Sequence, residues 1–147
     1  MKNRIPLLML ALALAASSAV TAQAAVCNDS TIRGSYAYTI HGQVLIPNGP
    51  TLLIDGLART TFDGQGNVTE LDAISANGNM APGWVLNTGT YSVNPDCTGT
   101  ITVTNGNQPL IHLQIIVAQS GNTIHEMVTD PGFATTSDGE RIKAPQQ

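Results

Sequence analysis

The chain has 147 residues, 42% of them apolar and 11% charged, and a formal net charge of −4 at pH 7. A charged fraction this low, with ordinary apolar content, excludes an intrinsically disordered chain, and the length suits one domain. The six basic residues form no run, so the electrostatic footprint that a nucleic-acid-binding protein needs is missing. We expect no nucleic-acid partner.

The first 24 residues are predicted to be a signal peptide. Lys2 and Arg4 precede an apolar stretch over residues 5–16, and a small-x-small cleavage pattern, Ala-Gln-Ala, ends the segment. The apolar stretch is shorter than the roughly 20 residues that a transmembrane helix needs, so we expect cleavage before Ala25 and no membrane span. The predicted location is therefore periplasmic or extracellular. Loss of the two basic residues changes the net charge from −4 to −6.

Two cysteines, Cys27 and Cys97, lie in the predicted exported domain, residues 25–147. In an oxidising compartment two cysteines allow one intramolecular pairing, and we therefore predict a disulfide bond between them. Closing a loop of this length stabilises a fold by up to about 4 kcal/mol in the chain-entropy treatment. Neither cysteine belongs to a Cys-x-x-Cys pair, so we expect no metal site and no cofactor here.

The exported part predicts an all-β domain. Segments of alternating polarity, rich in Thr, Val, Ile and Tyr, are separated by Gly, Asn, Asp and Pro, and no long segment has helical spacing. The predicted strands cover residues 34–45, 51–62, 68–76, 84–93, 99–104, 110–118, 123–130 and 139–144. About eight short strands in sequential hairpins favour a single antiparallel, mostly up-and-down β-barrel, with a β-sandwich as the alternative.

Three stretches carry a resemblance. They are Gly34-Ser35-Tyr36-Ala37-Tyr38, then Phe62-Asp63-Gly64 followed by Gly66-Asn67-Val68, and the run from Gly89-Thr90-Tyr91 to Cys97-Thr98-Gly99. Together they resemble a set of small secreted bacterial proteins of uncharacterised function, which are similar in outline to calycin-like barrels, the grouping of lipocalins and allene-oxide-cyclase-like folds. The resemblance covers most of the exported domain and implies the fold. It supplies no catalytic residue.

A tight turn at residues 63–67 would pair Phe62 with Val68. Alternation along the two strands then places Glu70 and Asp72 on the same face as Phe62. Because this face also carries apolar side chains, we expect it to point into the barrel. In the preceding strand Tyr36 and Tyr38 form the corresponding set.

Two interpretations of these carboxyl groups remain open. If Glu70 or Asp72 is buried beside Tyr36 or Tyr38, its pKa would be raised and it could act as a general acid or base. Alternatively, both carboxylates lie at a barrel rim or on a solvated edge. The candidate catalytic residues are Glu70, Asp72 and Tyr38, and the candidate ligand-binding residues are Tyr36, Tyr38, Phe62, Glu70 and Asp72.

The predicted strands over residues 110–118 and 123–130 are expected to pair as a second hairpin. If its strands pair about Ser120-Gly121, His112 and His125 share one face with Gln114, Met127 and Thr129, whereas Glu126 falls on the opposite, mainly apolar face. The two histidines are not opposite one another and no third ligand is evident, so we expect structural or surface histidines and no metal site.

The function that fits these predictions is binding of a small apolar or amphipathic ligand inside the barrel. One alternative is a cyclase or isomerase that uses lumen carboxyl groups or tyrosines. The other is a surface or matrix protein that makes contacts through its outer faces. The sequence does not indicate the oligomeric state.

Overall fold

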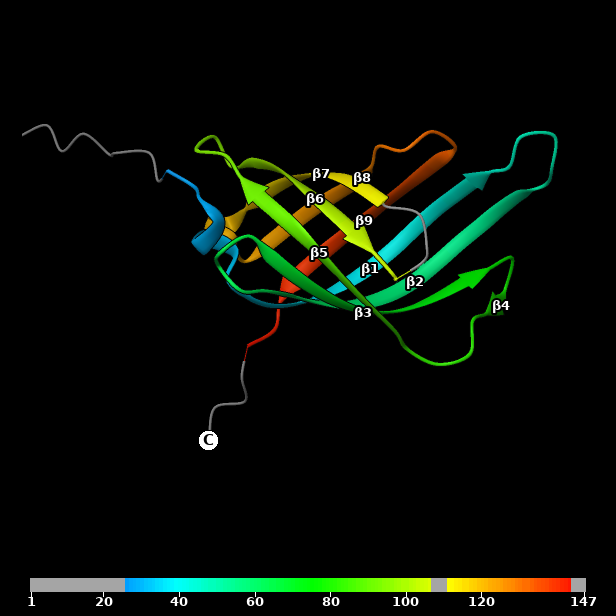
Figure 1. Cartoon of the computed structure of the whole chain (residues 1–147), viewed down its shortest axis with the longest axis horizontal. Helices are drawn as coiled ribbons and strands as arrows, with labels where there is room; N and C mark the ends of the chain where they lie inside the picture. Colours follow the sequence, from blue (N-terminus) through cyan, green and yellow to red (C-terminus); the bar gives the residue numbers. More distant parts are fainter. Residues whose placement is uncertain (1–25, 107–110, 144–147) are drawn as a thin grey trace, which may run out of the picture.

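The computed structural model describes residues 26–106 and 111–143, so the predicted signal peptide and its cleavage site lie outside the described residues. Eight antiparallel strands close into a barrel (Figure 1). The strands of the described part are β1 Gly34–Leu45, β2 Thr51–Phe62, β3 Asn67–Ala76, β4 Asn79–Met80, β5 Val85–Val93, β6 Thr98–Thr104, β7 Ile111–Ala118, β8 Thr123–Val128 and β9 Phe133–Arg141. The two-residue strand β4 is an addition at the edge of β3.

The barrel is an up-and-down meander, as predicted. Each barrel strand pairs with the next in the chain, β9 returns to β1, and the β2–β3 pairing completes the closure. Both predicted hairpin registers are confirmed, because Phe62 lies opposite Val68 and Leu113 lies opposite Val128. The tight turn between β2 and β3 is fixed by Asp63, whose Oδ1 accepts the backbone N–H groups of Gln65 at 2.7 Å and Asn67 at 3.0 Å.

The last strand, β9, begins earlier in the sequence than predicted. It begins at Phe133, six residues before the predicted start at Gly139. Its inward positions are Thr135, Ser137 and Gly139, which are small or polar, so the strand lacks the alternation of apolar side chains that marks the others. The two-residue strand β4 lies between the predicted strands 68–76 and 84–93 and was not predicted.

Two short 3-10 helices, η1 (Asp29–Ile32) and η2 (Gln119–Gly121), were not predicted. Asn28 caps η1, with its side-chain oxygen accepting the N–H of Ser30 at 3.0 Å. No helix among residues 26–106 and 111–143 is long and apolar enough to cross a membrane.

One end of the barrel is filled by η1 and by aromatic side chains. Ile32 is 0% exposed and packs in a core that includes Tyr36, Phe62 and Tyr91. The Phe62 ring meets Tyr36 edge-on at 5.6 Å between centroids and Tyr91 at 4.9 Å. The Tyr36 hydroxyl donates a hydrogen bond to the carbonyl of Gly121 in η2. This plugged half is therefore a close-packed core.

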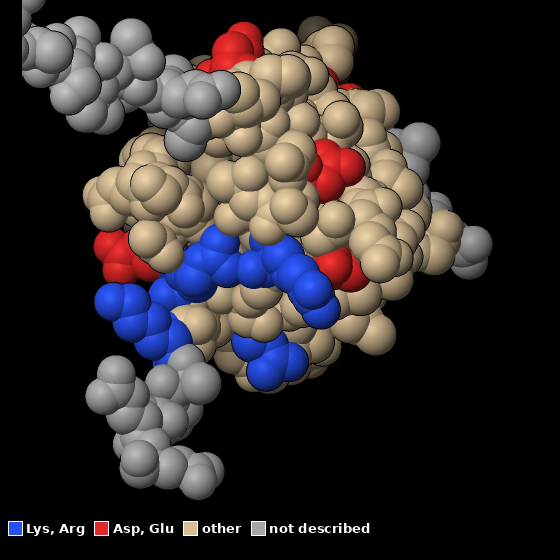
Figure 2. All heavy atoms as spheres, turned by 90° about the vertical axis from the view of Figure 1, so that its left-hand side faces the viewer, with Lys and Arg blue, Asp and Glu red and all other residues tan. Residues whose placement is uncertain are grey.

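Arg141, the last residue of β9, ties the plugged end together. Its guanidinium lies 4.8 Å from the centroid of the Tyr36 ring, and it donates hydrogen bonds to the carbonyl oxygens of Thr31 at 3.0 Å, Gly121 at 2.7 Å and Arg33. Figure 2 looks onto this end and shows basic side chains gathered there.

The predicted disulfide bond between Cys27 and Cys97 is present, with their Cα atoms 5.1 Å apart. It joins the segment that leads into η1 to the turn between β5 and β6. Cys27 also donates its backbone N–H to the carbonyl of Pro95 at 3.3 Å. The disulfide bond therefore stabilises the plugged end and forms no cross-link in the other half of the barrel.

Candidate ligand-binding cavity

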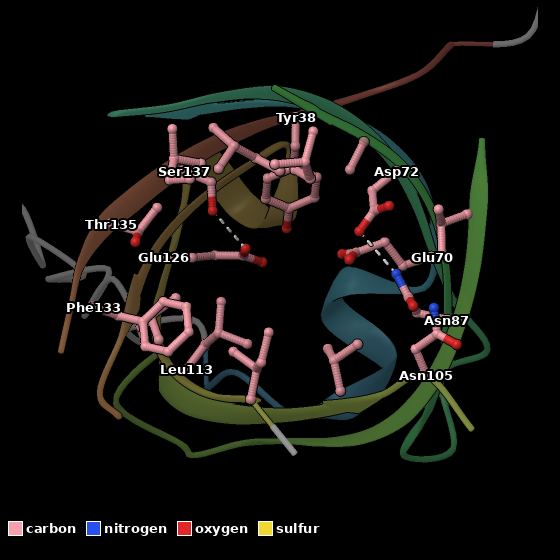
Figure 3. Close-up of a pocket in the computed structure, with 18 of the residues that line it drawn as sticks. Tyr38, Glu70, Asp72, Asn87, Asn105, Leu113, Glu126, Phe133, Thr135 and Ser137 are labelled. Atoms are coloured by element: carbon pink, nitrogen blue, oxygen red, sulfur yellow. Dashed lines mark hydrogen bonds between the residues drawn. The ribbon is translucent and has the colours of Figure 1, made fainter. Parts of the chain in front are cut away.

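The half of the barrel away from η1 encloses a cavity of about 470 Å³ (Figure 3). This volume lies within the range of small-molecule sites. Most of its wall is aliphatic or aromatic, and the apolar side chains come from all eight strands of the barrel. These wall residues are Ile40, Val44, Ile54, Ala58, Ile74, Val85, Val103, Ile111, Leu113, Val128 and Phe133.

Three carboxyl groups form a polar floor where the cavity meets the plugged core. Glu126 comes from β8, and Glu70 and Asp72 come from β3, which lies across the barrel from β8. The two glutamate side chains point toward one another from opposite walls (Figure 3). The sequence places them there because all three occupy inward positions of the period-2 alternation.

Each of these carboxyl groups accepts a hydrogen bond from an uncharged neighbour. Ser137 donates to Glu126 at 2.9 Å and Thr60 donates to Glu70 at 3.0 Å. Asp72 accepts the side-chain amide of Asn87 at 2.8 Å, and no Lys, Arg or His is among the described residues that line the cavity. The acidic groups of the floor therefore have no cationic partner in the described part of the chain.

Burial without a counter-charge changes how these groups titrate. Glu126 is only 8% exposed, and burial raises its pKa from 4.5 to about 8. Burial also raises the pKa of Glu70, with the Asp72 charge adding to the effect, and it raises the pKa of Asp72. At neutral pH the floor therefore keeps at least one proton that an exposed carboxyl would release.

Tyr38 completes the floor from β1. Its hydroxyl group points into the cavity beside the Glu126 carboxyl group (Figure 3), which interacts with it electrostatically, but the two groups are not placed for a regular hydrogen bond. Thr135 Oγ1, also buried at the cavity wall, has no hydrogen-bond partner among the described residues. Burial, followed by the charge of Glu126, raises the pKa of Tyr38 well above its usual value, so the phenol stays protonated.

Gly139 makes room for the Tyr38 ring. A Cβ atom at this position of β9 would lie 2.4 Å from the ring, which is closer than any real contact. The two residues are direct partners across β1 and β9. A glycine in the middle of this strand therefore lets the tyrosine lie flat against its neighbour.

Of the five candidate ligand-binding residues, the structure places Tyr38, Glu70 and Asp72 on the cavity and the other two elsewhere. Tyr36 and Phe62 were expected to line it, but both are packed in the plugged core. Their strand positions lie closer to the end that η1 fills, and η1 was not predicted. The carboxyl groups of Glu70 and Asp72 face the lumen rather than a solvated outer edge.

Glu126 is the residue that the sequence analysis did not single out. The signal was present, because a lone glutamate on the apolar face of the predicted 110–130 hairpin is a carboxyl group directed into the barrel. Its proximity to Tyr38 and its position across from Glu70 depend on barrel closure, which hairpin registers alone do not give.

All three histidines lie on the outer surface, and His112 and His125 are therefore surface residues, one of the two expected outcomes. Each contacts an aspartate: His41 lies 3.0 Å from Asp55, His112 lies 2.9 Å from Asp130, and His125 lies 2.6 Å from Asp138. In the part of the chain that the structure describes, no three His, Cys, Asp or Glu side chains are grouped so as to hold a metal ion.

No protein-family model matches this chain, and neither a curated protein nor a solved structure matches it. An apolar wall favours a hydrocarbon surface, and a floor of carboxyl and hydroxyl groups favours a polar end that donates hydrogen bonds.

Proposed function

We propose that this protein is exported and binds a small amphipathic ligand in the cavity half of its barrel. The observation that carries the proposal is the division of the barrel interior into a filled core and a cavity of about 470 Å³ with an apolar wall and a polar floor. A barrel that needed only to fold would gain by filling the second half with side chains as it fills the first.

Export is supported by the signal-peptide pattern at the N-terminus and by the disulfide bond, which is typical of oxidising compartments. The measurement is the intact mass of the protein from its own host. We expect a chain that begins at Ala25 and contains no free thiol. A chain that retains its first 24 residues in the cytoplasm would contradict export.

The test of ligand binding is native mass spectrometry of protein purified from its own host. We expect a retained small molecule that is released on denaturation. Ala58 is a buried wall residue, so Ala58→Phe would fill the cavity and abolish retention. Its matched control is Ala37→Phe, the same change at an exposed position of the neighbouring strand, which should retain the ligand. Equal retention by both variants would refute a site inside the barrel.

An acid–base enzyme is the second candidate, because the pKa values of Glu126 and Glu70 are raised by burial, and such carboxyl groups are suited to proton transfer near neutral pH. Carboxyl titration followed by NMR separates the candidates. Values near 4 for all three floor carboxyl groups would argue against acid–base catalysis. The cyclase or isomerase alternative rests on this observation.

The outer wall carries one feature that favours a surface-interaction role. Leu57, Met80 and Trp84 line a shallow depression on the outside of the barrel, and Trp84 is 58% exposed. A Trp84→Ser variant that loses self-association or partner binding, while keeping its cavity ligand, would favour this role.

A further inference from the structure

We infer that the ligand of the cavity carries a basic nitrogen, and that its ammonium group lies on the polar floor between Glu126 and Glu70, hydrogen-bonded to Tyr38, with its apolar part against the wall. This inference rests on the proposed function, because it names the chemical class of ligand for the same cavity. The following observations carry it.

The first is the charge of the floor. Three carboxyl groups line one cavity, and among the described lining residues there is no basic side chain to neutralise them. A ligand anion, such as a fatty acid, would add a fourth acidic group to a low-dielectric space and is strongly disfavoured. A cation supplies the counter-charge that the described lining lacks.

The second is the hydrogen-bonding capacity that is left over. The hydroxyl groups of Tyr38 and Thr135 are buried at the cavity, and neither makes a regular hydrogen bond within the described residues, although Tyr38 lies beside Glu126. Buried polar atoms are nearly always paired in folded proteins, so such atoms indicate a missing partner. An ammonium group has donors and no acceptor, and it matches a floor made of carboxyl and hydroxyl oxygen atoms.

The third is the spacing of the acids. Glu126 and Glu70 approach from opposite walls, and no three acidic, His or Cys side chains in the described part of the chain are grouped tightly enough to chelate a metal ion. A head group that is larger than a bare ion and can donate in several directions fits this arrangement. The apolar wall, which includes Phe133, then accommodates a hydrocarbon body.

Three probes with the same chain and different head groups test the inference: octylamine, octanol and octanoate. Titration calorimetry on the full exported protein should show octylamine binding at least about tenfold more tightly than octanol, which is the effect of one charge-assisted hydrogen bond, and octanoate not binding. Octanol that binds as tightly as octylamine would overturn the inference and leave the proposed function standing. Failure of all three probes, in protein that also retains no ligand from its host, would overturn both.

The glutamates offer a matched pair of variants. Glu126→Gln removes the floor carboxyl group that ammonium binding is expected to ionise, and it should reduce the preference for octylamine over octanol to less than about threefold, whereas octanol affinity should change little. Glu140→Gln makes the same change on the outer surface and should keep the full preference. If the Glu126 variant does not fold, Glu70→Gln takes its place. An unchanged preference in the floor variants would contradict the inference.

A pH series adds a readout that simple hydrophobic binding would not give. Apart from the ligand, Tyr38 from β1, Glu70 from β3 and Asp138 from β9 are the titratable groups that act on Glu126. Because the pKa of Glu126 is about 8 in the empty cavity, ammonium binding should release its proton. Octylamine affinity should therefore rise about tenfold per pH unit from pH 6 toward pH 8. A flat profile for octylamine would overturn the inference.

Discussion

Stability should fall as the pH rises from 5 to 8, and Glu126 is the main reason. In the unfolded chain this carboxyl has its ordinary pKa of 4.5, whereas burial in the barrel raises the pKa to about 8. Between these values the folded protein keeps a proton that the unfolded chain releases. The free energy of unfolding therefore falls by about 1.4 kcal/mol per pH unit across the window.

The total loss is about 5 kcal/mol, because the two pKa values differ by about 3.5 units. The stabilisation from the retained proton is complete below pH 4.5 and is lost by pH 8. Glu70 and Asp72, whose pKa values are also raised, act in the same direction. A typical domain has only about 5–15 kcal/mol of stability in total, so the effect is large enough to measure.

Glu126→Gln tests this reasoning directly. The amide keeps an oxygen that can accept the Ser137 hydroxyl and has no charge to bury. Urea unfolding at pH 5, 6, 7 and 8 should show the variant matching the wild type at the low end and exceeding it by up to about 5 kcal/mol at the high end. Glu140→Gln, at an exposed position, should follow the wild type. If the free energy of unfolding of the wild type and of the Glu126 variant changed equally with pH, Glu126 would not be the cause of the pH dependence.

Three further predictions concern the plugged half. In urea unfolding, Arg141→Ala should lower the free energy of unfolding by about 2–3 kcal/mol, because it removes several hydrogen bonds to backbone carbonyls and a cation–π contact. The control Arg59→Ala, at an exposed position, should change the free energy of unfolding by less than about 0.5 kcal/mol. Replacing Cys27 and Cys97 together by serine should cost up to about 4 kcal/mol, measured as the shift in urea midpoint against the oxidised protein. Ile32→Ala should cost about 3 kcal/mol, because the side chain is wholly buried; a loss below about 1 kcal/mol in thermal unfolding would show that η1 does not plug the barrel.

The barrel and its hairpin registers could be predicted because they follow from local features. The turn at residues 63–67 fixes the pairing of Phe62 with Val68, and this pairing determines which side of β3 holds Glu70. The inward side of β2 and β3 was predicted from the apolar side chains that share a face with Glu70 and Asp72. These signals lie within one or two neighbouring strands.

The division of the interior could not be predicted in the same way. Whether an inward residue lies in the core or on the cavity depends on where η1 inserts, and η1 is a four-residue helix held by Asn28, the disulfide bond and Arg141. The start of β9 was also hidden, because Thr135 and Ser137 face inward without being apolar. The contacts of η1 with Arg141 and the pairing of β9 with β1 both join segments that are far apart in the sequence.

The two halves of the barrel contribute oppositely to stability. In the plugged half, aromatic packing, the disulfide bond and the Arg141 contacts all favour the folded state. In the cavity half, an unfilled volume and buried carboxyl groups without counter-charges in the described lining both oppose it at neutral pH. Replacing Glu126 by a neutral side chain should stabilise the empty protein, so folding alone gives no reason for an acid at that position. A bound cation gives one, because it would convert the destabilising charges into an attractive site and return stability to the fold on binding.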